Sequence, residues 1–341
     1  MSYIIKQVTN KKEWEDFLKT QEYALFTQSS LYCDVYTKTG EKSWILGIYK
    51  DDTLVGGSLV TSVHAKRGNF LLLPYGPVLD YTNKEQFSSF ITAITAFARK
   101  QKYDFVRLSP FVENSPEIAR MFAEHTCRKS PMHVLAENTW ILDLHKTEEQ
   151  LFSDMKKNHR NLIRRCEREG VVIHKTKDTT AIQRLNTMHD IVAKRHQFHR
   201  FSKDFITQEF SVFAQNNNAE IFEATLPSGE VDSSAIILFY NNMACYRHSA
   251  SLHKNKRLPT SYLIQWEVIK EAKKRGFRYY NFWGIAPKEA SNTHPFKGIT
   301  HFKKGFGGVQ KDLFPCQDIV LTKKYYFNWI IETIRRIKRG F

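Results

Sequence analysis

The ten residues Ala98-Arg-Lys-Gln-Lys-Tyr-Asp-Phe-Val-Arg107 resemble a second stretch of the same chain, Ala272-Lys-Lys-Arg-Gly-Phe-Arg-Tyr-Tyr-Asn281, at an offset of 174 residues (272 − 98). Each combines the end of a basic helix with the start of a strand. The shorter stretches Val55-Gly-Gly-Ser58 and Val231-Asp-Ser-Ser234 match at an offset of 176 residues (231 − 55). Two nearly equal offsets predict that one α/β unit occurs twice in this chain.

The elements expected around these stretches follow the same order in both halves. In the first half we expect strands at 4–8, 43–50, 54–64, 69–73 and 105–108, and helices at 11–19, 30–40 and 84–100. In the second half we expect strands at 222–225, 231–240, 243–249 and 277–283, with a helix at 259–275. Turn residues separate most of these segments. The sequence therefore predicts an α/β fold with mixed sheets flanked by helices.

Composition sets broad bounds on function. A chain of 341 residues with 42% hydrophobic content is long enough for two domains. The formal net charge of +16 indicates a polyanionic partner, which is nucleic acid, a pyrophosphate or an anionic membrane. The cysteines and histidines show no metal-ligand spacing, so we expect reduced thiols and no metal. Because no export signal or long apolar segment is present, we expect a cytoplasmic protein without membrane-spanning helices.

A basic helix is expected between the two halves. Thr147-Glu-Glu-Gln150 has the form of a capping box, and the helix is expected over 151–169, ending at Gly170. We interpret one side as buried, namely Leu151, Phe152, Met155, Leu162, Ile163 and Cys166. The opposite side carries Lys156, Lys157, Arg160, Arg164, Arg165 and Arg168. A solvated helix face is one interpretation, but so much unneutralised charge favours a phosphate-bearing partner.

The stretch Phe302-Lys-Lys-Gly-Phe-Gly-Gly308 combines an apolar anchor, positive charge and glycines. One helical turn would place Phe302 and Phe306 on one side with Lys303 and Lys304 beside them. Such a group is suited to holding an amine against a developing oxyanion. Two solvated lysines on a short, glycine-capped helix are the alternative.

Two more segments add positive charge. Arg195, His199 and Arg200 cluster where helices expected at 178–197 and 203–215 follow one another, and we expect them to extend the basic surface. The segment 323–339 is amphipathic, aromatic at its start and basic at its end. We expect it to pack four apolar residues on the core: Phe327, Ile330, Ile331 and Ile334. Lying on an anionic bilayer, in peripheral contact with the inner membrane leaflet, is the alternative.

Four patches together resemble the Fem family of peptidoglycan-bridge aminoacyltransferases. They are Met155-Lys-Lys-Asn-His-Arg-Asn-Leu-Ile-Arg-Arg-Cys-Glu-Arg-Glu-Gly-Val171; Ala244-Cys-Tyr-Arg-His-Ser-Ala-Ser251; Pro259-Thr-Ser-Tyr-Leu-Ile-Gln-Trp266 with Asn281-Phe-Trp-Gly284; and Phe302-Lys-Lys-Gly-Phe-Gly-Gly308. The resemblance covers residues 155–308 well and the first half more weakly, through Gln28-Ser-Ser30.

The resemblance implies two GNAT-like domains, in which the C-terminal strand and helix return to the first domain. We expect the first domain at 1–145 plus 318–341 and the second at 146–317, in the short form without a coiled-coil arm. The implied reaction moves an amino acid from aminoacyl-tRNA to the amine of a stem peptide on a nucleotide-linked or lipid-linked muropeptide. No cofactor or metal is implied.

The resemblance also implies roles for individual residues. Lys303, next to Phe302, would stabilise the oxyanion formed during attack. The residues implied or expected to bind substrate are Tyr246, Arg195, Lys38, Tyr36, Ser109, Arg160, Arg164 and Trp283. Two positions depart from the family. Ser109 stands where an aspartate is common, and Tyr36, with Lys38 nearby, stands where short members carry a lysine.

Two other functions remain as alternatives. An N-acyltransferase that uses an acyl-CoA donor on a sugar or peptide amine would need a glycine-rich pyrophosphate loop, R/Q-x-x-G-x-G/A, which the sequence lacks. A non-enzymatic RNA-binding protein would fit the basic helix, but no RNA-binding module is recognisable. His248 and His301 lie in or near the patches as candidate bases, with structural roles as the alternative.

Overall fold

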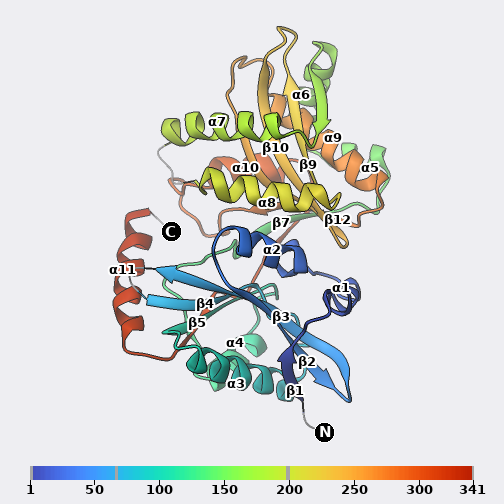
Figure 1. Ribbon diagram of the computed structural model, residues 1–341. Helices are drawn as coiled ribbons and strands as arrows, with labels where there is room; N and C mark the ends of the chain where they lie inside the picture. The colour runs from blue at the N-terminus through green and yellow to red at the C-terminus, as the bar shows by residue number, and fades with distance from the viewer. Residues whose placement is uncertain (1–2, 66–67, 197–199, 340–341) are drawn as a thin grey trace. The chain divides into compact units, whose positions relative to one another are not determined.

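The computed structural model describes residues 3–65, 68–196 and 200–339, which form two compact units (Figure 1). The first unit comprises Met1–Thr139, Ala286–Lys297 and Lys311–Phe341, and the second Trp140–Ile285 and Gly298–Gln310. The boundaries expected from the sequence, at 145 and 318, lie six and seven residues from the boundaries at Thr139 and Lys311 (145 − 139, 318 − 311). The sequence-based division also placed residues 286–297 in the second unit, whereas they belong to the first.

A mixed seven-stranded sheet forms the centre of the first unit. Its strands are, in spatial order, β1 (Ile4–Gln7), β2 (Ser43–Lys50), β3 (Thr53–Ala65), β4 (Gly68–Tyr75), β5 (Phe105–Pro110), β14 (Gln317–Val320) and β6 (Arg128–Lys129). Neighbours from β1 to β4 are antiparallel, whereas β4 and β5 are parallel. The helices are α1 (Lys11–Lys19), α2 (Ser30–Lys38), α3 (Lys84–Lys100), α4 (Pro116–Glu124) and α11 (Lys324–Arg339), with a short 3-10 helix at Phe26–Gln28.

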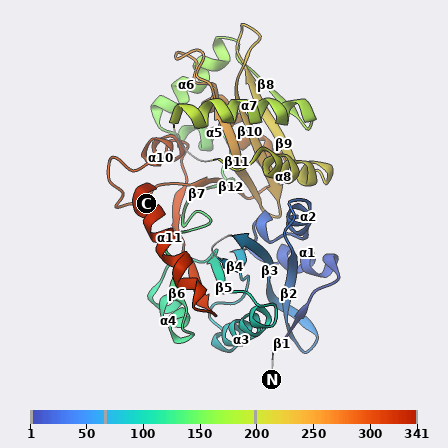
Figure 2. The same cartoon turned by 60° about the vertical axis from the view of Figure 1, so that its left-hand side comes forward.

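The second unit repeats this plan. Its sheet has the spatial order β8 (Val172–Thr176), β9 (Ala219–Thr225), β10 (Val231–Tyr240), β11 (Met243–Ser251), β12 (Tyr279–Gly284), β7 (Asn138–Asp143) and β13 (Val309–Asp312). The helices are α5 (Glu148–Ser153), α6 (Lys157–Arg168), α7 (Thr179–His196), α8 (Lys203–Gln215), α9 (Thr260–Lys274) and α10 (Lys297–Lys304). Helices α7 and α8 cover one face of the sheet (Figures 1 and 2), and α9 covers the other (Figure 1).

The predicted duplication and α/β fold class are confirmed. Helix α3 ends at Lys100 and β5 begins at Phe105, while α9 ends at Lys274 and β12 begins at Tyr279, so both boundaries repeat at an offset of 174 (274 − 100 and 279 − 105). In each unit this helix connects two parallel strands. In the first unit, β14 returns from the end of the chain to pair with β5, as the resemblance implied.

Gln28, in the patch that linked the first half to the family, has a structural role. Its Nε2 donates to the Pro74 carbonyl at 2.6 Å, and its Oε1 accepts from the Leu59 amide at 2.8 Å. A Cβ on Gly76 would lie 2.7 Å from this Nε2, so the neighbouring turn needs glycine. The buried amide therefore joins the loop before α2 to both β3 and β4.

The continuous helix predicted over 151–169 is wrong, although its capping box at Thr147 is confirmed. The chain breaks between α5 and α6 at Asp154–Lys156. Arg160 donates to the carbonyls of Ser153 and Met155 at 2.6 and 2.5 Å, and the Lys156 amide donates to the Gly305 carbonyl at 2.9 Å. These long-range and side-chain partners satisfy the backbone groups that a helix would otherwise pair. The predicted buried face is nevertheless buried or half-buried.

The expected packing of α11 is also wrong. Phe327, Ile330 and Ile334 are exposed, and Ile331 is only half-buried. The side of α11 that faces the sheet carries Tyr325, Asn328 and Glu332, all of which are buried. The physical reason is Arg107 on β5, whose buried charge requires carboxylates.

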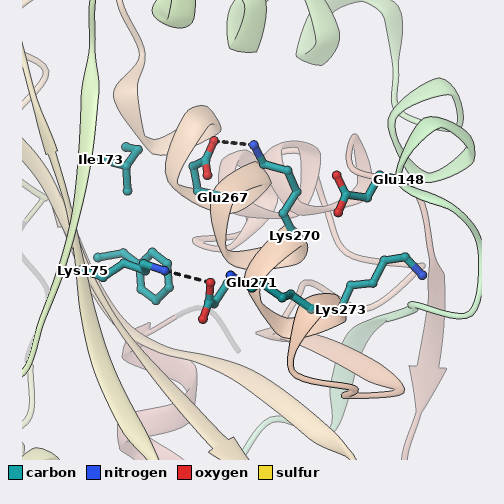
Figure 3. A pocket seen from close by; sticks show the side chains of 9 residues that line it. Glu148, Ile173, Lys175, Glu267, Lys270, Glu271 and Lys273 are labelled. Atoms are coloured by element: carbon teal, nitrogen blue, oxygen red, sulfur yellow. Dashed lines mark hydrogen bonds and ion pairs between the residues drawn. The ribbon is translucent and has the colours of Figure 1, made fainter.

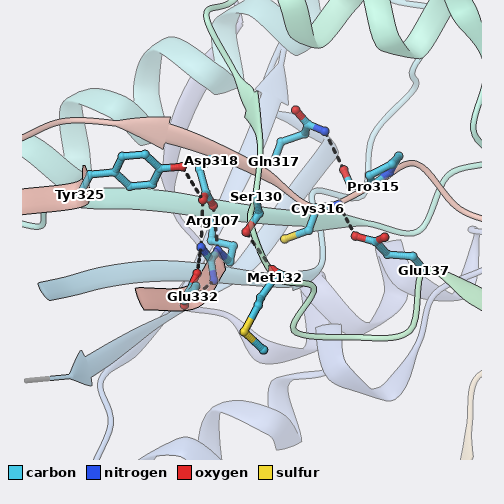
Figure 4. Close-up of polar contacts among 10 residues, drawn as sticks. All are labelled: Arg107, Ser130, Met132, Glu137, Pro315, Cys316, Gln317, Asp318, Tyr325 and Glu332. Carbon is cyan, nitrogen blue, oxygen red and sulfur yellow. Dashed lines mark hydrogen bonds and ion pairs between the residues drawn. The ribbon is translucent and has the colours of Figure 1, made fainter. Parts of the chain in front are cut away.

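Arg107 lies between two acidic side chains (Figure 4). Its Nε and Nη2 donate to Asp318 on β14 at 2.8 and 2.9 Å. Its Nη1 and Nη2 donate to Glu332 on α11 at 3.1 and 2.8 Å. Burial disfavours the charged guanidinium, but Asp318 outweighs this effect and holds the pKa of Arg107 above its ordinary value. Turning the apolar side of α11 inward would leave this charge without its second partner.

Candidate active site

The two parallel strands of the second unit pair over a short distance only. Strands β11 and β12 pair from Met243 and Tyr279 to Cys245 and Asn281, and the register ends there. In the first unit, β4 and β5 pair along their whole shared length. The next residues of β11 and β12 lie beyond this paired stretch, and they include the predicted site residues Tyr246 and Trp283.

Lys303 reaches the end of β12. It is 4% exposed, and its Nζ donates to the Gly284 carbonyl at 2.6 Å. The preceding residue, Trp283, adopts a left-handed conformation (φ 68°), and its amide donates to Asn281 Oδ1 at 2.8 Å. Among the described residues, no carboxylate forms an ion pair with Lys303. Burial lowers the pKa of Lys303 to about 7, so the amine titrates near neutral pH.

Phe302 belongs to an aromatic group beside this lysine. Its ring lies edge-on to those of Tyr262 and Phe306, at centroid distances of 4.9 and 5.2 Å. His159 of α6, a residue that the sequence patterns did not indicate, donates from Nε2 to the Phe302 carbonyl at 2.9 Å. The carbonyl is an acceptor, so this contact fixes the ring tautomer with the proton on Nε2.

The glycines after Lys304 are required by close packing. Helix α10 ends at Lys304, and a Cβ on Gly305 would overlap the His159 ring. Gly308, with φ of 97°, lies against the Ile141 carbonyl of β7. The side chain of Lys304 points elsewhere, since its Nζ donates to Gln310 Oε1 at 2.9 Å and lies 5.2 Å from the Trp140 ring centroid. The two neighbouring lysines thus have different environments, and only Lys303 is buried.

A buried ionic cluster lies next to Trp283. Arg247 is the extra residue of a β-bulge in β11, because Tyr246 pairs with Ile237 and His248 pairs with Ile236. Its guanidinium lies 5.2 Å from the Trp283 ring centroid.

The carboxylate of that cluster is Glu209 of α8. It accepts from Arg247 at 3.1 Å and lies 2.8 Å from His248 Nε2. Burial alone would raise the pKa of Glu209, but Arg247 and His248 lower it to about 2. Burial and the neighbouring Arg247 lower the pKa of His248. The cluster contacts Trp283 through the Arg247 guanidinium. The sequence patterns did not indicate this cluster, because Glu209 on α8 and Arg247 on β11 are 38 residues apart.

Tyr246 lies in the core beside this cluster, where burial raises its pKa to about 12. Arg195 is exposed, and its Nη2 donates to the Leu252 carbonyl at 3.1 Å. Arg200 pairs instead with Asp190 at 2.8 Å, and His199 lies outside the described residues. Arg195 and Arg200 therefore have different partners.

The predicted residues of the first unit lie on two elements. Tyr36 is half-buried on α2 with its ring 5.0 Å from that of Tyr32, and Lys38 is exposed at the end of the same helix. Ser109 is buried near the end of β5, opposite Pro74 of β4.

The basic face of α6 is exposed except at Arg160, which is half-buried and holds the break between α5 and α6. Arg164 is exposed and lies 5.1 Å from the Phe152 ring centroid. Both arginines line a shallow hollow of about 470 Å³ with Glu149 and Ser153.

A hollow of about 530 Å³ lies elsewhere on the second unit, between β8 and α9 (Figure 3). Two of its lysines are paired with carboxylates, because Lys175 contacts Glu271 at 2.8 Å and Lys270 contacts Glu267 at 2.7 Å. None of the predicted site residues lines it. The size of this hollow therefore does not identify it as the active site. The buried amine of Lys303 instead indicates where the candidate active site lies.

Within residues 3–65, 68–196 and 200–339, no group of His, Cys, Asp and Glu side chains is arranged to hold a metal ion. The five cysteines are free thiols. In the same described part of the chain, no helix is both long and apolar enough to cross a membrane.

Comparison with known proteins identifies the family. A model of the FemAB family matches residues 9–115 and 228–314, which is more than half of the 341 residues. The aminoacyltransferase FemA of Staphylococcus epidermidis is 28% identical over 103 residues, which cover 30% of this chain and 25% of FemA. This match thus spans about a quarter of that relative. The lipid II:glycine glycyltransferase of Staphylococcus aureus (strain USA300) is 19% identical over 394 residues, covering 94% of this chain and 93% of that protein.

The crystal structure of FemX has the same fold. It superposes with a TM-score of 0.85 at 15% identity, covering 97% of this chain and all of that chain. The matched segments of the family model contain Phe302, Lys303, Trp283 and Tyr246, whereas the basic face of α6 lies outside them. On this evidence, the chain belongs to the FemAB family.

Proposed function

We propose that this protein transfers an amino acid from aminoacyl-tRNA to an amine on the stem peptide of a peptidoglycan precursor. The observation that carries the proposal is Lys303. It is a buried amine without a carboxylate partner among the described residues, it contacts the end of β12, and it lies inside the segments that match the family. A buried cation has a large electrostatic effect on charge that develops beside it.

The chemistry needs little beyond positioning and charge stabilisation, because an aminoacyl ester is already activated. The acceptor amine attacks the ester carbonyl carbon, a C–N bond forms, and the carbonyl oxygen becomes an oxyanion. Collapse of this intermediate breaks the C–O bond to the tRNA ribose, which leaves as a hydroxyl while the amine loses a proton. In its protonated form, Lys303 would stabilise the oxyanion, and Phe302 would shield it from water.

The exposed basic side of α6 is the proposed contact for the tRNA. Lys156, Lys157, Arg164, Arg165 and Arg168 are exposed, and phosphate contacts of this kind are sequence-independent. Arg160 supports this surface from within, since its guanidinium is bound to backbone carbonyls.

The acceptor would be a nucleotide-linked or lipid-linked muropeptide. One relative is named for its action on lipid II. Tyr246 and Trp283 in the second unit, with Tyr36, Lys38 and Ser109 in the first, are the proposed acceptor-binding residues, and Arg195 is the proposed contact for the precursor phosphates. The protein would then meet its acceptor in the cytoplasm, at the inner face of the membrane where the acceptor is lipid-linked.

The test uses purified protein and tRNA charged with a mixture of radiolabelled amino acids. Nucleotide-linked and lipid-linked muropeptides are supplied in separate reactions, and a further reaction contains acetyl-CoA instead of tRNA. We expect label to move from tRNA to a muropeptide.

Lys303→Ala should reduce transfer by about a hundredfold or more, as for the loss of an oxyanion stabiliser. The matched control is Lys304→Ala, which removes the same charge one residue away and should keep most activity. Product from acetyl-CoA alone, or equal loss in both variants, would contradict the proposal.

A further inference from the structure

Helix α11 presents an apolar face outward. This face consists of Tyr326, Phe327, Trp329, Ile330, Ile334 and Ile337, which are between 39% (Trp329) and 70% (Ile337) exposed. At 100° per residue, these six side chains fall within about 160° of the helix circumference. Contiguous exposed apolar surface of this kind marks a site of interaction.

The outward orientation is built into the fold. On the opposite side of α11, Glu332 is bound to Arg107, and Tyr325 donates to Asp318 Oδ2 at 3.0 Å. The Tyr325 ring also packs on Phe105, at a centroid distance of 5.2 Å. Rotating the helix to bury its apolar face would break these buried contacts, so the face stays available.

Positive charge borders the apolar face. Lys324 and Lys338 lie along one border and Arg336 along the other, and Arg335 lies beyond the first border. Glu332 is the one acidic residue in the sequence of α11, and it is engaged with Arg107 on the buried side. The outer surface of the helix is therefore apolar in the middle and cationic at its edges.

We propose that α11 lies in the plane of an anionic lipid bilayer, with its apolar face at the boundary between headgroups and acyl chains. Amphipathic helices with aromatic and aliphatic residues on one face and Lys and Arg around it bind such surfaces. Trp329 and Tyr326 have rings that suit the interface, and the bordering cations meet lipid phosphates.

The charges around the apolar face of α11 favour a bilayer over a second copy of the chain as its binding partner. A two-fold contact through this face would place the basic borders of two copies near one another, where they repel. An anionic surface instead neutralises them, in keeping with the net charge of +16.

The test is flotation with phosphatidylcholine vesicles that contain or lack phosphatidylglycerol, without tRNA or muropeptide. It is therefore independent of the proposed transferase reaction. We expect binding to the anionic vesicles, weakened by salt, and little binding to the neutral ones.

The decisive variant is Phe327→Ser with Ile330→Ser and Ile334→Ser, at positions 60%, 52% and 48% exposed. Its vesicle affinity should fall by about a hundredfold or more, because three side chains lose their apolar burial. The matched control is Ile4→Ser with Val172→Ser and Ile191→Ser, at positions 59%, 50% and 46% exposed on other elements. This control should bind as the unmodified protein does.

Two further measurements complete the test. The emission of Trp329 should shift to shorter wavelength on anionic vesicles, and Trp329→Phe should remove this shift while binding persists. Arg335→Gln with Arg336→Gln and Lys338→Gln should weaken binding by roughly tenfold to a hundredfold at low salt.

Three results would overturn the proposal. The first is that the unmodified protein does not bind anionic vesicles. The second is that the control triple variant loses as much vesicle affinity as the decisive one. The third is that the protein binds no vesicles but forms a dimer in solution, which the decisive triple variant dissociates. Circular dichroism of each variant confirms that it is folded.

Discussion

Arg107 in the first unit and Lys303 in the second are both buried cations, but their surroundings differ. In the first unit, Arg107 is bound to Asp318 and Glu332, and the parallel strands around it pair along their shared length. In the second unit, Lys303 donates to one backbone carbonyl, and the parallel strands that it approaches separate after Cys245. A paired buried charge is part of the scaffold, whereas a buried charge without a counter-ion indicates function.

The largest expected effect is on stability in the first unit. Arg107→Met leaves the buried carboxylates of Asp318 and Glu332 without their cationic partner, and we expect it to lower the free energy of unfolding by about 3–5 kcal/mol. Urea denaturation measures this change. Adding Asp318→Asn and Glu332→Gln should recover a large part of the loss, and a single variant that unfolds like the unmodified protein would show that the cluster is not structural.

Lys303→Met, in contrast, should raise the free energy of unfolding. Burial lowers the folded-state pKa of Lys303 from 10.5 to about 7, so the unfolded state binds more protons between these pH values. The cost of burying the amine is greatest below pH 7 and declines as pH rises toward 10.5. We therefore expect the variant to be more stable by a few kcal/mol at pH 6, with an advantage that shrinks by pH 9.

Denaturation curves across this pH range provide the measurement, with Lys304→Met as the control. Because Lys304 is only half-buried, its variant should differ from the unmodified protein by less than about 0.5 kcal/mol at every pH. If the stabilities of the two variants changed equally with pH, Lys303 would not be the more costly of the two lysines to bury.

The pH dependence of transfer sharpens the role of Lys303. If its protonated form stabilises the oxyanion, kcat should decline as pH rises through about 7, by up to tenfold for each pH unit above that value. Rates measured from pH 5.5 to 9 at saturating substrate test this. A rate that rises through the same pH would instead identify Lys303 as the base that removes the amine proton.

The smallest expected effects distinguish two arginines of α6 by whether their guanidinium groups are bound within the protein or exposed. Arg160 is bound to two carbonyls, so Arg160→Gln should cost about 1 kcal/mol of stability. Arg164 is exposed, so Arg164→Gln should leave stability unchanged and lower the salt dependence of tRNA binding by about one phosphate contact. Filter binding at several salt concentrations distinguishes them.

Sequence patterns predicted what depends on local periodicity and repetition. The duplicated order of helix and strand, the capping box at Thr147 and the buried face of α6 are all present in the structure. The second helix ends at Lys274, one residue before its predicted end at Arg275. Phe302 and Lys303 stood out because an apolar residue, a cation and glycines are adjacent in the chain. Whether they act as assigned stays a prediction.

What was missed depends on distant partners. The amphipathic pattern of α11 is correct, but the side that faces the sheet was assigned wrongly, because Arg107 lies 225 residues before Glu332. The break at Asp154–Lys156 depends on Gly305, and the role of His159 depends on the Phe302 carbonyl. No pattern within one helix contains this information.

The return of β14 and α11 to the first unit has a consequence for the order of synthesis. Arg107 is made 211 residues before Asp318, an interval of about 10 to 40 s at the pace of translation. During this time the nascent first unit has a cation at its centre without counter-ions, while the sequence of the second unit is being completed. Strand β14 and helix α11, which are made after the second unit, therefore neutralise the first core, and a chain interrupted before them would expose a defect that proteases can recognise.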